Sequence, residues 1–317
     1  MKYFVLLFSI IILLTGCNNN GGTGINPLPN FDAMWDYSHP DSTEMRFKEI
    51  LPLLQNTSEF NIDADYQVQL LTQIARAQGL QGKFHEADST LKEAKKLMTE
   101  DMSIAKIRYL LEKGRMFNSL GDKEQARPLF LEAYEYGLIN NLDLYTVDAA
   151  HMMGIVEPAA KQLDWSLMAL EVAEKSEDER CRGWLGALYN NIGWTFFDMQ
   201  KYEDALKIHQ KGYEWRKGQN NPEATRIAKW SVARMLRAVE NYDEAMIMQQ
   251  EILQELQENN LPADGYVFEE LAELNLQKGN KSEASKYFAQ AYDLLSLDIW
   301  LVENEPERIT RMKKLGK

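Results

Sequence analysis

The side chains that most often carry out catalysis or bind metals are few and scattered in this sequence. The four histidines do not form an HExxH pattern, and none has a second metal ligand at helical spacing: His39, His85, His151 and His209. GxSxG, Walker A and strand-following GxGxxG patterns are also missing from the sequence. The sequence therefore predicts no enzymatic activity, no cofactor and no metal.

The charge of the chain argues against another class of function. It has 48 acidic and 35 basic residues, a formal net charge of −13. Proteins that bind nucleic acids generally need a basic face, so no nucleic-acid partner is expected. Pairs of acidic residues on such a chain are more typical of solvated helix faces than of acid–base catalysis.

The elements that position the remaining candidate residues are predicted to be paired helices. Residues 190–217 form two apolar stripes with helical spacing. Ile192, Gly193 and Phe196 share a face of the first predicted helix, and Tyr202 and Ala205 share a face of the second. Small residues on these faces allow close approach of two helix backbones, and the large ones fill the space that remains.

The same order of small and large residues recurs along the chain. A small residue opens each second helix at intervals of 39 or 40 residues: Ala87, Ala126, Ser166, Ala205, Ala245 and Ala284. Another small residue precedes each of them by twelve positions: Ala75, Gly114, Gly154, Gly193, Ala233 and Ala272. Gly82, Gly121 and Gly279 each stand five positions before the second-helix residue, where a left-handed helix C-cap is expected.

This pattern resembles the tetratricopeptide repeat (TPR), a helix–turn–helix unit that stacks on copies of itself. The resemblance implies an all-α, right-handed α-solenoid over residues 31–317, with about six helix pairs. We expect the repeats at 68–101, 107–140, 147–180, 186–219, 226–259 and 265–298. A helix at 43–54, with Ser42 as its N-cap, should cap the first repeat. Residues 299–317 should cap the last repeat, with Trp300 and Leu301 covering its core.

The start of the chain has the features of an exported lipoprotein. Lys2 precedes an apolar run at 4–14, which is too short for a typical membrane span. The residues Leu14-Thr15-Gly16-Cys17 resemble the lipobox of bacterial lipoproteins. This resemblance implies a signal peptide at 1–16, acylation of Cys17 with fatty acids such as palmitate, and a flexible tether at 17–30. It also favours the cell envelope, at the periplasmic face of the outer membrane. A secretory signal with a chance cysteine is the alternative.

The TPR resemblance also implies a binding groove lined by the first helix of each pair. The residues that we expect at its centre are Asn190, Asn191, Trp194, Trp230, Arg234 and Arg237, with Arg115 and His151 extending it. The same family positions hold Gln69, Gln73, Arg76, Arg108, Glu112, Asn118, Met152, Ile155, Phe197, Glu269, Glu270 and Glu273. Amides can bond a peptide backbone, arginines can bind carboxylates through two bonds, and indoles can serve as apolar anchors.

Two functions remain open on the sequence alone. The first is a membrane-anchored scaffold that binds a peptide segment or a partner protein of the envelope. The second is a carbohydrate- or small-ligand-binding lipoprotein resembling the SusD group, for which a set of tryptophans could stack on sugars. That group interrupts its repeats with long ligand-binding loops, whereas the period of this chain is almost unbroken. The sequence therefore favours the scaffold.

Overall fold

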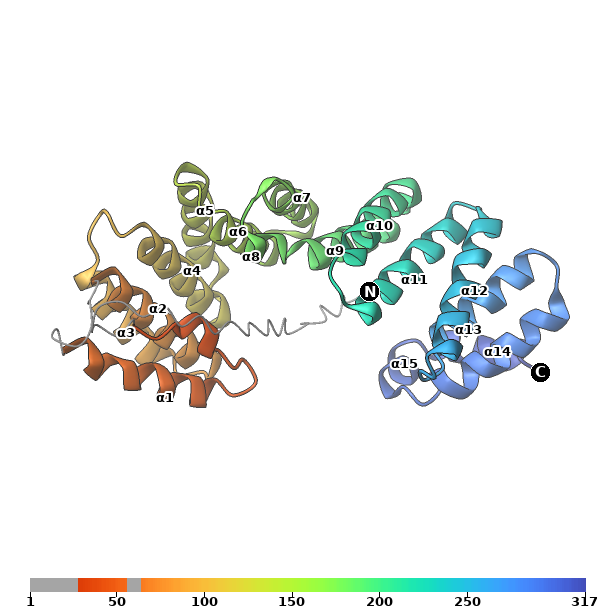
Figure 1. Ribbon diagram of the computed structural model, residues 1–317. Helices are drawn as coiled ribbons and strands as arrows, with labels where there is room; N and C mark the ends of the chain where they lie inside the picture. The colour runs from red at the N-terminus through yellow and green to blue at the C-terminus, as the bar shows by residue number, and fades with distance from the viewer. Residues whose placement is uncertain (1–27, 56–63) are drawn as a thin grey trace, which may run out of the picture. The chain divides into compact units, whose positions relative to one another are not determined.

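Every regular element in the described part of the chain is a helix (Figure 1). The computed structural model describes residues 28–55 and 64–317. The predicted all-α class is therefore confirmed. The predicted signal peptide, Cys17 and residues 18–27 of the predicted tether lie outside the described residues. No helix in the described ranges combines the length and the hydropathy needed to cross a membrane.

The chain divides into two compact units, with the boundary between Cys181 and Arg182. We call them the N-terminal unit and the C-terminal unit. The helices of the N-terminal unit are η1 (Phe31–Met34), α1 (Pro40–Ile50), η2 (Leu51–Gln55), α2 (Ala64–Leu80), α3 (Phe84–Leu97), α4 (Ser103–Ser119), α5 (Lys123–Ile139), α6 (Asp143–Val156) and α7 (Ala159–Lys175). The short helix α8 (Glu179–Arg182) crosses the boundary.

The C-terminal unit continues the same alternation of helices. Its helices are α9 (Leu185–Asp198), α10 (Tyr202–Lys217), α11 (Pro222–Ala238), α12 (Tyr242–Glu258), α13 (Gly265–Gln277), α14 (Lys281–Leu295), α15 (Ile299–Asn304) and α16 (Pro306–Leu315). The predicted repeats correspond to the pairs α2–α3, α4–α5, α6–α7, α9–α10, α11–α12 and α13–α14. Within each unit, helices of one pair pack on each other and on the next pair.

The small residues of the repeat lie where two helices of a pair come closest. A Cβ atom added to Gly114 of α4 would stand 2.5 Å from the Phe130 ring of α5. At Gly193 of α9, an added Cβ would overlap the ring of His209 on α10. The large residue of the second helix thus fills the space left by the small residue of the first, which explains why the sequence pattern predicts the pairing.

The turn glycines adopt the predicted left-handed conformation. The φ angles of Gly82, Gly121 and Gly279 are 74°, 81° and 80°, and each residue follows the end of a first helix. Gln200 and Glu240 occupy the equivalent turns of the pairs α9–α10 and α11–α12, with φ angles of 60° and 63°. These two side chains pay a steric cost that glycine would avoid.

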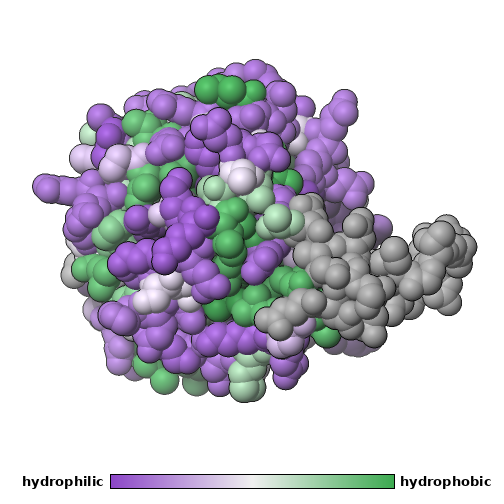
Figure 2. Space-filling model, turned by 90° about the vertical axis from the view of Figure 1, so that its left-hand side faces the viewer, coloured by the Kyte–Doolittle hydropathy of each residue, from purple (hydrophilic) through white to green (hydrophobic). Residues whose placement is uncertain are grey.

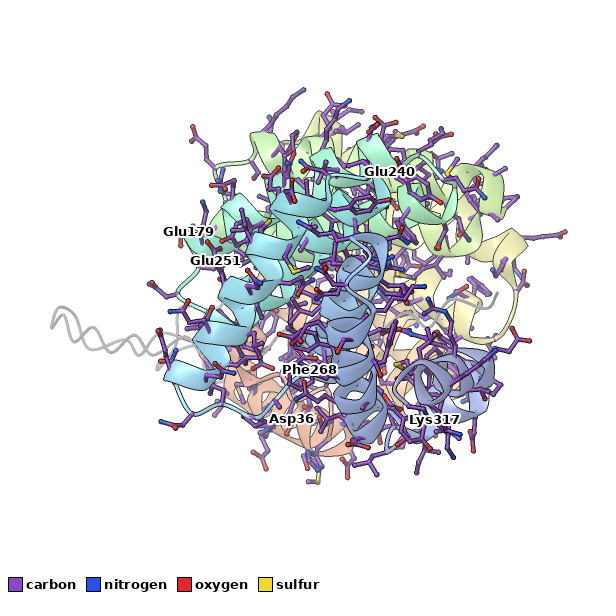
Figure 3. The ribbon with its side chains drawn as sticks, turned by 90° about the vertical axis from the view of Figure 1, so that its right-hand side faces the viewer. Asp36, Glu179, Glu240, Glu251, Phe268 and Lys317 are labelled. Atoms are coloured by element: carbon purple, nitrogen blue, oxygen red, sulfur yellow. The ribbon has the colours of Figure 1, made fainter. Side chains whose placement is uncertain are left out.

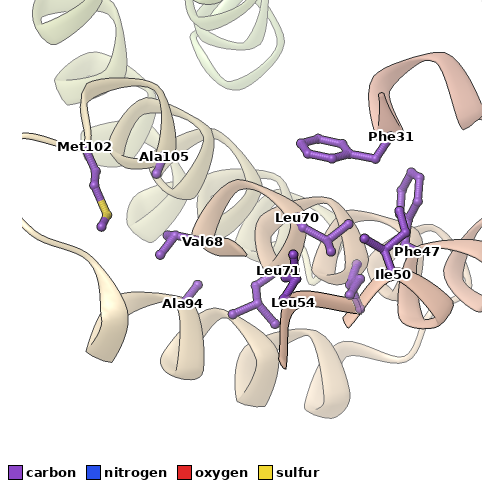
Figure 4. Packing of buried hydrophobic residues seen from close by; sticks show 11 residues of the cluster. Phe31, Phe47, Ile50, Leu54, Val68, Leu70, Leu71, Ala94, Met102 and Ala105 are labelled. Carbon is purple, nitrogen blue, oxygen red and sulfur yellow. The ribbon is translucent and has the colours of Figure 1, made fainter. Parts of the chain in front are cut away.

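Both ends of the part of the chain that runs from residue 28 to residue 317 pack against the terminal repeats. Phe31 and Phe47 join the core of the first repeat, which also contains Leu70 and Leu71 (Figure 4). The capping helix α1 begins at Pro40, with His39 as its N-cap residue, and not after Ser42 as the sequence suggested. Proline is suited to the first turn of a helix, which accounts for the earlier start.

At the other end, α16 packs on α14 and buries Met312 against the core of the last repeat. Leu301 is buried in the same cluster, as expected, while Trp300 remains 39% exposed. Figure 3 views the molecule from this side and shows Phe268 beside α14, where its ring stacks on Tyr287 at 6.1 Å. The carbonyl oxygen of Lys317 accepts a hydrogen bond from Ser285 Oγ at 3.2 Å.

Candidate binding surfaces

The first helices of the repeats carry most of the residues that the sequence singles out. We call the side of α2, α4 and α6 that bears Arg76, Arg115 and His151 the N-terminal first-helix surface. We call the side of α9, α11 and α13 that bears Trp194, Trp230 and Arg234 the C-terminal first-helix surface. The two surfaces belong to different compact units.

Arg115 is held by carboxylates on both sides. Its Nη1 donates to Glu112 Oε1 at 2.6 Å, and its Nη2 donates to Asp148 Oδ1 at 2.5 Å. The Nη1 of Arg76 donates to Glu112 Oε2 at 3.2 Å, so the network joins α2, α4 and α6. The network gives Arg115 a structural role between neighbouring first helices, and its charge is balanced within the unit.

His151 lies half-buried beside this network. Burial lowers the pKa of His151, and the nearby charge of Asp148 opposes that effect. Burial acts to raise the pKa of Asp148, but Arg115 outweighs it and holds the pKa below its usual value. Near neutral pH the network therefore contains an ionised carboxylate and a largely neutral imidazole.

Arg234 and Arg237 both contact one buried carboxylate on the next first helix. The Nε and Nη2 of Arg237 donate to the two oxygens of Glu270 at 2.7 and 3.0 Å. The Nε of Arg234 lies 3.2 Å from Glu270 Oε1, and its guanidinium stands 5.3 Å from the centre of the Phe197 ring. Burial raises the pKa of Glu270 to about 7, against the lowering effect of Arg237.

The two arginines therefore differ in how their guanidinium groups contact Glu270. Arg237 uses a two-bond geometry on Glu270 and serves mainly to join α11 to α13. Arg234 contacts the same carboxylate through its Nε, without the two-bond geometry of Arg237. Because an arginine can bind a carboxylate through its two Nη groups, Arg234 is the better candidate for contact with an acidic ligand.

The aromatic residues predicted for the groove come together in a row. The ring centres of Trp194 and Trp230 are 6.1 Å apart, and Trp230 stands 6.0 Å from Tyr266 on the next first helix. The Nε1 of Trp230 donates to the carbonyl oxygen of Tyr266 at 3.2 Å. Trp194 also contacts the Phe197 ring at 5.5 Å. The row continues across α9, α11 and α13, and both tryptophans keep part of their surface exposed.

Asn190 and Asn191 are exposed on α9, one helical turn before Trp194. The Nδ2 of Asn190 donates to Asn191 Oδ1 at 3.3 Å, a long bond that a ligand could replace. The structure thus places Asn190, Asn191, Trp194, Trp230 and Arg234 on one unit. It also shows the acidic partners that the sequence analysis did not pair with the arginines.

A simple signal in the sequence would have found those partners. Asp148 follows Arg115 by 33 positions, and Glu270 follows Arg237 by the same number. An opposite charge about one repeat later lies on the neighbouring first helix, because the helices of successive repeats stack side by side. Charge pairing between repeats is therefore a signal separate from the order of small and large residues within each repeat.

Neither surface has the composition of a metal site. No cluster of histidine, cysteine, aspartate and glutamate in residues 28–55 and 64–317 could hold a metal ion. The exterior of the N-terminal unit, which faces the viewer in Figure 2, is mostly hydrophilic with separate hydrophobic areas.

Comparisons with known proteins agree with the fold. The chain is similar to the TPR sensor protein PH0952 of Pyrococcus horikoshii, with a TM-score of 0.61, 17% identity and coverage of 87% of this chain and 43% of that one. It is also similar to the apo form of RapI, with a TM-score of 0.62, 15% identity and coverage of 86% and 80%. Aspartyl phosphate phosphatase F of Bacillus subtilis is a third similar structure, with a TM-score of 0.50, 14% identity and coverage of 88% and 74%.

This chain therefore spans less than half the length of PH0952. No family model matches the sequence, and a search of curated proteins also finds no match. At these identities the likeness concerns the fold alone, and the described part of the chain has an all-α, TPR-like fold.

Proposed function

We propose that this protein is a lipid-anchored interaction scaffold of the bacterial cell envelope, which binds a peptide segment of a partner protein. The binding site is the C-terminal first-helix surface. The observation that carries this proposal is the row of Trp194, Trp230 and Tyr266 across three successive first helices. Half-buried indoles are frequent anchors of protein interfaces, because they bury much apolar area at little cost in conformational entropy.

The polar groups beside the row fit an extended peptide. The amides of Asn190 and Asn191 can bond both the N–H and the C=O groups of a peptide backbone. The Nη groups of Arg234 can bind an acidic side chain or a C-terminal carboxylate. A carbohydrate is less well matched, because the indoles of Trp194 and Trp230 pack against each other and neither presents a fully open face.

The binding part of the proposal is tested by truncating the anchor residues. Trp194→Ala with Arg234→Ala should lose a partner that the wild-type chain captures from solubilised membranes, because truncating an anchor typically costs about 2 kcal/mol or more of binding. Partner affinity is then measured by titration with the purified partner. The matched control is Trp215→Ala with Lys207→Ala, which removes a tryptophan and a cation from the second helix α10 of the same pair.

The control should keep the partner. Both double variants should show the helical far-UV spectrum of the wild-type chain. Unchanged affinity in the Trp194 and Arg234 variant would show that the C-terminal first-helix surface is not the binding site.

The anchoring part of the proposal depends on Cys17 and is tested separately. Cys17→Ser should abolish incorporation of labelled palmitate and should leave uncleaved precursor or release the protein from the membrane fraction, since the thiol is the acylation site in a lipobox. Cys181→Ser is the matched control, because Cys181 is buried in the folded unit and should not affect labelling. Normal labelling of the Cys17 variant would refute the lipobox assignment.

A further inference from the structure

The N-terminal first-helix surface is already occupied by a segment of the same chain. Residues 29–37, which we call the N-terminal segment, contact side chains of α2 and α4. The hydroxyl of Tyr66 donates to the carbonyl oxygen of Pro29 at 2.8 Å, and Trp35 Nε1 donates to Gln73 Oε1 at 3.1 Å. The contact between Asp32 and Arg108 joins residues 76 positions apart. Side-chain pairs between neighbouring first helices, such as Arg76 with Glu112, are about one repeat apart.

The centre of this contact is a carboxylate bound by a buried arginine. The Nη1 of Arg108 donates to Asp32 Oδ1 at 2.9 Å, and the Nη2 of Arg108 contacts Asp32 Oδ2. The Nε of Arg108 donates to the Tyr145 hydroxyl on α6 at 3.0 Å. The Arg108 side chain is 8% exposed, whereas Asp32 is 41% exposed. A buried guanidinium requires an anion, so this surface is built to receive a carboxylate.

Aromatic rings of the N-terminal segment contact a second arginine, Arg76. The rings of Trp35 and Tyr37 stack at 4.7 Å with an angle of 7° between their planes. The Arg76 guanidinium stands 5.9 Å from the Trp35 ring and 5.6 Å from the Tyr37 ring, which is within cation–π range. Arg76 therefore contacts both the aromatic rings of the N-terminal segment and the carboxylate of Glu112.

Only one residue of the N-terminal segment is fully buried in the core. Phe31 is its buried residue, and it packs on Phe47 (Figure 4). Its ring also contacts the Tyr66 ring edge-to-face at 5.1 Å. Tyr37 is 51% exposed, and the other residues of the segment are half-buried or exposed. Segments with few buried apolar contacts open locally at a lower free energy than the rest of a fold.

We infer that the N-terminal first-helix surface is a second recognition site, which takes a peptide with an acidic residue between aromatic residues. In this structure the chain's own N-terminal segment fills the site, and a partner with the same chemistry binds by displacing it. Arg108 binds the acidic residue of the incoming peptide, and Arg76 contacts its aromatic residues. This site goes beyond the proposed function, because it lies in the other unit and uses none of the residues assigned there.

The experiment uses a fluorescently labelled peptide with the sequence of residues 28–38, Leu-Pro-Asn-Phe-Asp-Ala-Met-Trp-Asp-Tyr-Ser. Its binding to the full chain is measured by fluorescence anisotropy. The variant Asp32→Ala with Trp35→Ala releases the chain's own segment and should bind the peptide at least about tenfold more tightly than the wild type, which must first open its filled site. Adding Arg108→Gln to this variant should abolish the gain.

The peptide itself provides a matched control, because it contains two aspartates. A peptide with Asp32→Asn should bind the released variant at least about tenfold more weakly, since it loses the charge-assisted bonds to Arg108. A peptide with Asp36→Asn should bind as the unaltered peptide does, because the Asp36 carboxylate contacts Ser38 and His39, which follow it in the chain. Equal affinities of the two altered peptides would overturn the inference.

Absence of binding by a released variant with the wild-type far-UV spectrum would also overturn it. If the released variant unfolds, the wild-type chain gives the answer by amide hydrogen exchange. Peptide at about 1 mM, close to the effective concentration of a tethered segment, should speed exchange in residues 29–37. Unchanged exchange there would refute the site. Trp194→Ala with Arg234→Ala should leave peptide binding intact, which separates this inference from the proposed function.

Discussion

One position of the repeat shows the effect of a single polar residue in the core. The residue four positions after the small second-helix residue is Leu91, Phe130, Leu170, His209, Gln249 or Phe288. All six are buried, but two of them are polar. Among the described residues, His209 Nε2 and both amide atoms of Gln249 have no hydrogen-bond partner. Leaving a buried polar group unpaired costs about 1–3 kcal/mol. His209 and Gln249 therefore lower the unfolding free energy of the C-terminal unit.

His209→Phe should therefore stabilise the protein. Gly193 already leaves space opposite this position, as Gly114 does opposite Phe130. We expect an increase in unfolding free energy of about 1–2 kcal/mol near pH 7, measured by urea denaturation. Gly193 must be kept, because a Cβ at that position would overlap the ring. A decrease in stability would show that His209 makes a favourable interaction.

The same variant should also change how stability depends on pH. Burial lowers the pKa of His209 from 6.5 to about 4. Between pH 6.5 and pH 4, His209 is protonated in the unfolded chain but remains neutral in the folded chain. The free energy of unfolding therefore decreases as the pH falls through this window. The wild type should lose up to about 3 kcal/mol more than His209→Phe across this window. The exposed His85, changed to Gln, provides the control, and equal pH profiles for the wild type and His209→Phe would contradict the prediction.

The helix pair depends on its turn as well as on its core. Gly82, Gly121 and Gly279 adopt positive φ at the end of a first helix, and Gln200 and Glu240 adopt it without the freedom of glycine. Both side chains are exposed. Left-handed backbone costs roughly 1–2 kcal/mol for a residue with a Cβ, which is more than the extra entropy that glycine loses on folding.

Glu240→Gly and Gln200→Gly should each stabilise the C-terminal unit by about 0.5–1 kcal/mol, because they remove this steric cost. Thermal melting measures the gain, and the two changes should add, since the turns belong to different pairs. The reciprocal control is Gly121→Ala, which should destabilise the N-terminal unit by about 1 kcal/mol. A lower melting temperature for both glycine variants would refute the strain argument.

On the scale of the whole chain, the apolar faces of the terminal repeats must be covered by capping helices. The helix α16 supplies it at the C-terminal end, where Met312 is fully buried. Its arginines also bind the acidic residues of the last first helix: Arg308 Nε donates to Glu269 Oε1 at 2.7 Å, and Arg311 Nη2 donates to Glu273 Oε2 at 3.0 Å. α16 thus acts on α13 much as the first helix of a further repeat would.

Removal of residues 305–317 should destabilise the C-terminal unit by several kcal/mol, since burial of a residue such as Met312 is worth about 1.5–3 kcal/mol and two carboxylates lose their partners. Arg308→Gln with Arg311→Gln keeps the apolar cover and should cost less than the truncation. Urea denaturation gives both values. A truncated chain as stable as the wild type would show that α16 does not cap the stack.

Much of the fold could be predicted from the sequence, because it depends on local spacing. The interval of 39 or 40 residues between small residues located all six helix pairs, and the turn glycines located the ends of three of the first helices. Each repeat packs mainly on its neighbours, so a periodic pattern contains nearly all the information about the fold. The position of Asn190, Trp194 and Arg234 on first helices followed from the same register.

The partners of these residues could not be predicted in the same way. Asp148, Glu270 and Asp32 bind arginines on other helices, and such pairs depend on which side chains the stacked helices bring within bonding distance. The contact of Asp32 with Arg108 has no periodic signal at all, because the N-terminal segment lies outside the repeats. By itself, the sequence determined the helix pairs and the residues on their exposed faces. Only the tertiary structure decided which charges are already neutralised and which surface is already filled, because these depend on contacts across space between segments that have no fixed spacing along the chain.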